Sequence, residues 1–207
     1  MGLETRTGGN YITILDGKLC QRVPEGTAGS VERVNKVGNT VHEKFYDSFT
    51  GKLVGISVQD GNYGKTWNFS FRDNGELYTL QLSYSNSFAT AFLKQLPNVD
   101  LTKVMKVSPS VKEVDGKKRS SLFINQDGQT IKHAYTKENP NGMPDLEQVT
   151  VKGEKVWDDT KRIDFLHEMV MSNIVPKLAD DTVAPETDAE SLKKEVEDEM
   201  NPEEIPF

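Results

Sequence analysis

Hydrophobic and polar residues alternate along most of the first 135 residues, and this period of two is typical of half-buried antiparallel strands. The clearest example surrounds Asn74-Gly75, a dipeptide that favours a tight hairpin turn. Counting outward from this turn places six apolar residues on one face, in the pairs Phe71 with Tyr78, Phe69 with Leu80, and Trp67 with Leu82. The alternation therefore predicts a half-buried hairpin and fixes its register.

Two more hairpins are predicted on the same grounds, with turns at Thr50-Gly51 and Asp127-Gly128. The first would bury Val41, Phe45 and Phe49 and would leave His42, Lys44 and Tyr46 on the polar face. The second would direct Leu122, Ile124, Ile131, His133 and Tyr135 inward and would leave Phe123 outward, beside Arg119 and Lys132.

Two segments have helical spacing instead. In "NSFATAFLKQL" the residues Phe88, Ala91, Phe92 and Gln95 share one face, which predicts a short helix between the second and third hairpins. In "DTKRIDFLHEMVMSNIV" the apolar set Ile163, Leu166, Val170 and Ile174 predicts a second helix that ends or kinks at Pro176. Strands and helices do not alternate as in a parallel α/β sheet. The pattern predicts a mainly β fold, an OB-fold-like antiparallel barrel with one interposed short helix and a C-terminal helix; a β-sandwich is the alternative.

The charge divides the chain into a body and a tail. Residues 180–207 contain 11 acids and only two bases, whereas the rest of the chain has a net charge of +2. The last segment also lacks an apolar stripe, so we expect it to be disordered. The predicted organisation is an OB-like domain over 1–155, a helical appendage over 156–179 and a disordered acidic tail over 180–207. Such asymmetry suggests binding to nucleic acid or a protein partner, or a solubilising tail.

Several classes of protein are disfavoured by the sequence. It has no apolar run long enough to span a membrane and no signal-peptide pattern, so we expect a cytoplasmic protein. No phosphate-binding glycine loop is present, and the three histidines lie on separate predicted elements. The single cysteine, Cys20, lies in a strand-like segment and is interpreted as a small buried hydrophobe rather than a nucleophile. We therefore expect no enzyme activity, no cofactor and no metal site.

Aromatic and basic side chains on the predicted hairpins indicate a different chemistry. Single-stranded nucleic acid is bound without sequence preference by a positively charged groove in which bases stack on aromatic rings. The candidate DNA-binding residues are Tyr46 with Lys44 and His42, Tyr63 and Lys65 in a glycine-rich loop, Phe123 with Lys132, and the basic run Lys117, Lys118 and Arg119. Trp67 is included as well, although its apolar stripe with Phe69 and Phe71 favours a place in the core.

The final residues, "NPEEIPF", provide the most specific signal in the sequence. An acidic tail that closes in Ile205-Pro206-Phe207 resembles the C-terminal tip of bacterial single-stranded DNA-binding proteins. The longer barrel region and the helix after it look more like a bacteriophage protein of this type. The resemblance implies that Phe207 fills a pocket of a partner enzyme while its carboxylate pairs with a base. Ile205 and Pro206 would shape the approach, and Glu203 and Glu204 would steer the tip to a basic rim.

Together these observations predict a non-enzymatic single-stranded DNA-binding protein. The resemblance implies roles in replication, recombination and repair, with partner enzymes recruited through the tip in a bacterial or phage-infected cell. A homo-oligomer is possible, and no membrane partner is expected. The alternative is an interaction or decoy protein that docks host enzymes through the tip without binding DNA. A β-rich structural protein with a coincidental ending is a third interpretation.

Overall fold

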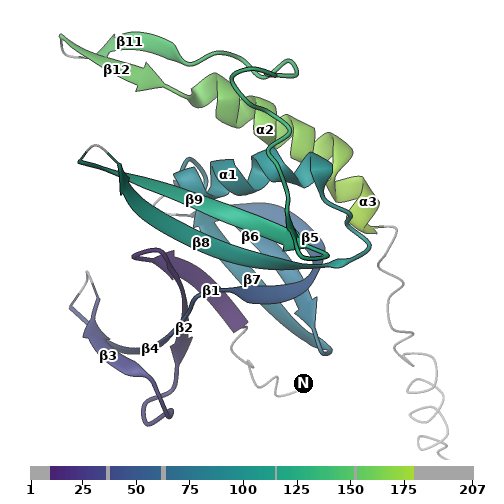
Figure 1. The fold of residues 1–207 in the computed structure, drawn as a ribbon. Coiled ribbons are helices and arrows are strands. Elements are labelled where there is room, and N and C mark those ends of the chain that lie inside the picture. Colours follow the sequence, from purple (N-terminus) through teal and green to yellow (C-terminus); the bar gives the residue numbers. More distant parts are fainter. Residues whose placement is uncertain (1–9, 36–37, 62–63, 115, 152, 180–207) are drawn as a thin grey trace, which may run out of the picture.

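The computed structural model describes residues 10–35, 38–61, 64–114, 116–151 and 153–179, and these residues are mainly β. The helices are α1 (Ser87–Gln95), α2 (Thr160–Asn173) and α3 (Val175–Ala179). The strands, in chain order, are β1 (Asn10–Leu15), β2 (Lys18–Val23), β3 (Val31–Val34), β4 (Thr40–Tyr46), β5 (Phe49–Gly61), β6 (Gly64–Asp73), β7 (Glu76–Ser83), β8 (Val104–Val114), β9 (Lys117–Gln126), β10 (Gln129–Thr130), β11 (Glu147–Val151) and β12 (Glu154–Asp158). The predicted mainly β chain with one interposed helix and one C-terminal helix is confirmed (Figure 1).

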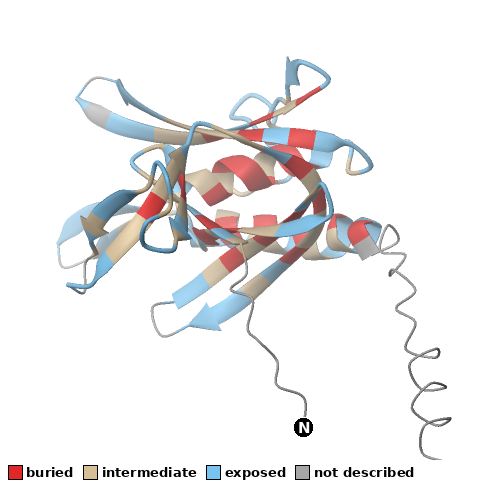
Figure 2. Cartoon of the chain, turned by 90° about the horizontal axis from the view of Figure 1, so that it is seen from below, coloured by how far each residue is buried: buried red, intermediate tan, exposed pale blue. Residues whose placement is uncertain are grey.

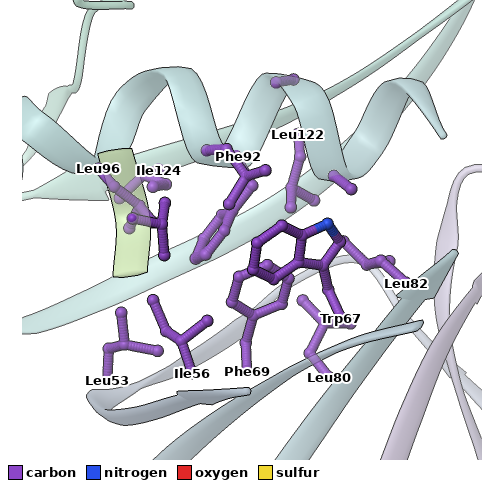
Figure 3. Close-up of a cluster of buried hydrophobic side chains, with 14 of the residues drawn as sticks. Leu53, Ile56, Trp67, Phe69, Leu80, Leu82, Phe92, Leu96, Leu122 and Ile124 are labelled. Carbon is purple, nitrogen blue, oxygen red and sulfur yellow. The ribbon is translucent and has the colours of Figure 1, made fainter. Parts of the chain in front are cut away.

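The predicted hairpin around Asn74-Gly75 forms β6 and β7 with the expected register. Its apolar face lies in the centre of the core, where Trp67, Phe69 and Phe71 are fully buried. Figure 3 shows Phe92 of α1 pointing into the same cluster, and its ring centroid lies 4.7 Å from that of Phe69. Alternation on the strands and 3.6-residue spacing on the helix therefore bury their apolar faces against each other.

The strands join one ten-stranded sheet in the order β10-β9-β8-β5-β6-β7-β1-β2-β4-β3, with β11 and β12 as a separate pair. This sheet is not closed into a barrel, because the two edges that would meet have other partners. The edge of β7 pairs in parallel with β1. The edge of β9 is bound by a side chain of α1: Gln95 donates to the Leu122 carbonyl (2.6 Å) and accepts from the Ile124 amide (2.9 Å).

The predicted hairpin with a turn at Thr50-Gly51 is wrong. β5 runs straight through these two residues and pairs with β6 and β8, whereas β4 pairs with β2 and β3. The chain turns at Asp47 and Ser48 instead. Gly51 allows the continuous strand to pass the core, since a Cβ there would lie 2.8 Å from the Phe49 ring. The turn at Asp127-Gly128 is confirmed, but β10 is only two residues long and β9 pairs mainly with β8.

The C-terminal helix packs on the same core as the sheet. Leu166 and Val170 of α2 are fully buried, and His167 lies against the rings of Trp67 and Tyr84. The helix ends at Asn173, and α3, which contains Pro176, continues in a new direction. Figure 2 shows buried segments around the centre of the molecule, whereas the outer ends of the hairpins are exposed. The division between residues 155 and 156 stays a prediction, and residues 180–207 lie outside the described residues.

Candidate nucleic-acid interface

The outer face of the ten-stranded sheet is the side opposite the core, and its residues alternate with the core residues along each strand. Residues paired across neighbouring strands lie on the same side of the sheet, and the register continues this outer face from β9 to β3. Its described basic side chains are Lys18, Arg22, Arg33, Lys52, Arg72, Lys106, Lys112 and Arg119. Among the described strand residues, Glu43 is the one acid on this outer face. The outer face is therefore strongly basic, although the body as a whole carries little net charge.

The N-terminal strands bend away from the rest of the sheet and form a trough on this outer face. Figure 1 shows β1, β2, β4 and β3 as an arc beneath the β8–β9 hairpin. The trough contains a cleft of about 460 Å³ lined by Tyr11, Thr13, Cys20, Arg22, Arg33, Glu43 and Gln81. Tyr11 is 52% exposed, so a ring face at the start of β1 is open to a ligand. The trough thus combines an exposed aromatic ring with two arginines.

Glu43 is buried at the floor of the trough and is neutralised there. Both of its carboxylate oxygens accept hydrogen bonds from Arg33, at 2.8 Å each, and Arg22 lies 3.9 Å away. The hydrogen bonds from Arg33 are the main reason that the pKa of the Glu43 carboxyl is lowered. Because a buried carboxylate needs such partners, Glu43 orients Arg33 without making the surface acidic.

Cys20 lies beside Glu43 and is buried, as the sequence predicted. Burial and the neighbouring carboxylate raise the pKa of its thiol to about 11, so almost no thiolate exists near neutral pH. We expect Ellman's reagent at pH 8 to label the folded protein at least about tenfold more slowly than the urea-unfolded chain. The urea-unfolded chain is the control for reagent activity. Equal labelling rates would contradict both the burial and the raised pKa.

The β8–β9 hairpin forms a basic arm next to the trough. On its outer face Phe123 is 39% exposed, opposite Ser108 and between Arg119 and Asn125 along the strand. Lys106 and Lys112 lie on the neighbouring strand β8 and on the same outer face. The arm touches the N-terminal strands, since a Cβ built on Gly17 in the β1–β2 turn would lie 3.0 Å from the Val111 side chain. Val111 lies on the face of the arm opposite Phe123, so this contact leaves the Phe123 ring exposed on the outer side.

The structure does not bring all the predicted DNA-binding residues together. Phe123 and Arg119 lie on the outer face, whereas the register places Tyr46, Lys44 and His42 on the opposite side of the sheet. Tyr46 instead lines a small cleft with Phe49 and Tyr78. The sequence placed these three side chains on the outer face because it paired β4 with β5. In the structure β4 pairs with β2, and this pairing turns them to the opposite side.

The remaining predicted contacts are scattered. Trp67 is fully buried and donates to the Tyr84 carbonyl (3.2 Å), so it is a core residue and is not available to a base. The Lys65 ammonium lies 5.6 Å from the centre of the Tyr84 ring. Lys118 has the parity opposite to that of Arg119, and Lys132 is exposed beyond β10. Tyr63, the side chain of Lys117 and the tip residues 203–207 lie outside the described residues.

Sequence reasoning missed most of the bases on the outer face, as well as Tyr11. A signal was present for Lys106 and Lys112, which alternate with Met105, Val107 and Val111. Arg22 and Arg33 had no such signal, because strands as short as β2 and β3 reveal their faces only through their neighbours.

Within the described ranges, no three His, Cys, Asp or Glu side chains gather in a way that suits a metal ion. None of the described helices has the length and apolar character needed to cross a membrane. No family model matches the chain, and comparisons with curated proteins and with solved structures found no significant match.

Proposed function

We propose that this protein binds single-stranded DNA without sequence preference on the outer face of its sheet. We further propose that β5–β9 with α1 form a partly open OB-fold. Five antiparallel strands in the order β9-β8-β5-β6-β7, with a helix inserted after the third, support this assignment. OB-folds bind oligonucleotides on the face of their second and third strands, which correspond to β6 and β7 here. That face continues directly into the trough through the β7–β1 pair.

The observation that carries the proposal is the one-sided charge of the sheet. Its outer face presents many lysines and arginines, and among the described strand residues Glu43 is the one acid there, buried and paired; Asp47, just after β4, pairs with Lys18. Phosphates would therefore be attracted along most of this face. Between the bases lie short hydroxyl and amide side chains, among them Asn68, Ser70, Thr79 and Gln81. Such groups bind phosphates and sugars without distinguishing bases. Tyr11 and Phe123 supply the exposed rings on which bases stack.

Recruitment of replication, recombination or repair enzymes through residues 203–207 is the second part of the proposal, and it rests on the tip sequence alone. A decoy that binds enzymes but no DNA would have no need of a basic sheet face, which favours the DNA-binding interpretation. The alternative is nevertheless one outcome of the binding test.

The direct test is fluorescence anisotropy with labelled oligo-dT at two salt concentrations. With about four phosphate contacts, affinity should fall roughly 50-fold between 50 and 200 mM salt, because bound counterions are released on binding. Absence of binding at 50 mM salt would overturn the proposal and favour the decoy. Tight binding that does not respond to salt would contradict a phosphate-binding face.

Phe123→Ala should weaken oligo-dT binding by about 1–3 kcal/mol, or roughly 5- to 150-fold, because an exposed ring that stacks on a base is lost. The free energy of unfolding should change by less than about 1 kcal/mol, since the side chain is largely outside the core. Val156→Ala is the matched control, because Val156 is similarly exposed (40%) but lies on β12, outside the basic face. Equal affinities of the two variants would exclude Phe123 from the interface.

A further inference from the structure

A separate groove lies between α1 and the segment that leads into α2. Two adjoining clefts, of about 390 and 800 Å³, share the residues Lys94, His133, Leu146 and Arg162. Figure 1 shows α1, α2 and the β11–β12 hairpin on the side of the molecule away from the N-terminal arc. We call this feature the helix groove, and none of the candidate DNA contacts named above lines it.

The helix groove gathers the bases Lys94, Lys137 and Arg162, and the acids Asp145 and Asp159 also line it. Lys94 is half-buried at the end of α1, and burial together with nearby Arg162 lowers the pKa of its ammonium. His133 is close enough to Lys94 that its own pKa is lowered, mainly by burial and also by that charge. Among the described residues, the acid nearest Arg162 is Asp145, 3.8 Å away and fully exposed. Within the described residues, Lys94 has no acid at salt-bridge distance, so its half-buried ammonium favours an anionic ligand.

The larger cleft of the groove also has apolar walls. Tyr135 and Met143 form buried walls, whereas Leu146 is 39% and Trp157 67% exposed. An exposed tryptophan of this kind beside a recess is characteristic of interaction surfaces. The groove therefore suits a ligand that carries negative charge next to a compact apolar group.

We propose that the helix groove binds the acidic tip of the same chain, residues 203–207. Glu203 and Glu204 provide the anions for Lys94 and Arg162. Ile205 and Phe207 provide the apolar group for Leu146 and Trp157.

The chain is long enough to make this contact. From Ala179 back to Arg162 the helical path is about 25 Å, at 1.5 Å per residue. The 24 residues from 180 to 203 span up to about 80 Å when extended. Because its extended length is about three times the required distance, the segment can place residues 203–207 at the groove without being fully stretched. Attachment to the same chain gives these residues a high local concentration, which favours binding within one molecule.

The two tryptophans of the chain make the test direct, because Trp67 is fully buried and Trp157 is exposed at the groove. Acrylamide quenching of the full-length protein should be weak while the tip shields Trp157. The tip variant Glu203→Lys/Glu204→Lys/Phe207→Ser should raise the Stern–Volmer constant about two- to threefold. Trp157→Phe gives the background signal of Trp67. Asp180→Lys/Asp181→Lys is the control for charge in the tail, and it should leave quenching unchanged.

The groove side is tested with Leu146→Ser, which should raise the quenching of Trp157 as the tip variant does, without requiring any change in the tail. Shielding should be independent of protein concentration. Equal quenching of wild type and the tip variant would overturn the proposal. Shielding that disappears on dilution would assign the groove to the tip of a second copy instead. Restored shielding of the tip variant by oligo-dT would assign it to nucleic acid, and would also overturn the proposal.

Discussion

Lys106→Glu/Arg119→Glu is expected to weaken oligo-dT binding by about 100-fold at 50 mM salt. Both side chains lie on the outer face of the β8–β9 arm, on either side of Phe123 in the sheet. On the proposed interface, replacing each cation with an anion would remove a phosphate contact and add repulsion beside the bound strand. The slope of log affinity against log salt should become smaller by about 1.4 for two lost contacts. Fluorescence anisotropy across a salt series measures both quantities.

Lys155→Glu/Lys177→Glu is the matched control for this prediction. It changes the net charge by the same amount, but on β12 and α3 rather than on the basic face. If binding depends on the position of the bases, the control should lose less than about threefold in affinity. Equal losses in the two double variants would mean that overall charge, and not this face, attracts the strand. A loss of affinity without a change of slope would argue against phosphate contacts by Lys106 and Arg119.

The success of the sequence predictions depended on where each strand found its partners. The β6–β7 hairpin was predicted with its exact register, because its turn and its alternation act between residues close in the chain. β4 and β5 are also adjacent in sequence, yet β4 pairs with β3 and β2, and β5 pairs with β6 and β8. Each strand has a hairpin partner on its other side and a second partner further away in the chain, and the alternation around Thr50-Gly51 does not reveal this choice of partners.

The candidate site was also predicted well where the pattern within one strand determines the face, and poorly where the face depends on strand partners. Phe123 and Arg119 were placed correctly because their strand alternates clearly with Leu122 and Ile124. Tyr46 was assigned to the wrong side along with its hairpin. The trough was not foreseen at all, because Tyr11, Arg22 and Arg33 come together only after β1 has joined β7 and the N-terminal strands have bent outward. A face built from several short strands exists only in the assembled sheet.

At the edge of β9 that faces α1, the side chain of Gln95 takes the place of a neighbouring strand. Gln95 presents an amide to the strand, and that amide donates to one backbone carbonyl and accepts from one backbone N–H, as a neighbouring strand would. Its Nε2 also lies 2.9 Å from the Ala91 carbonyl in its own helix. The helical spacing predicted that Gln95 faces inward, but its partners on β9 are 27 and 29 residues further along the chain. This contact allows α1 to occupy the gap between β7 and β9.

Gln95→Met should lower the free energy of unfolding by about 2–4 kcal/mol. Methionine keeps the length and flexibility of the side chain, so packing is largely preserved, but the Leu122 carbonyl and the Ile124 amide lose their partners in a buried site. Each unsatisfied buried group costs about 1–3 kcal/mol. For a folded region of this size the melting temperature should fall by about 4–16 °C. Urea unfolding followed by circular dichroism measures the change.

Asn98→Ala provides the comparison that separates this effect from the loss of any amide. Asn98 also donates to a backbone carbonyl, that of Lys132 at 2.9 Å, but in an exposed position where water replaces the bond. Its loss should cost less than about 1 kcal/mol. If Gln95→Met and Asn98→Ala cost the same, the Gln95 amide does not substitute for a strand. The open edge of β9 would then be stabilised by the packing of α1 alone, and Phe92 rather than Gln95 would hold the helix in the gap.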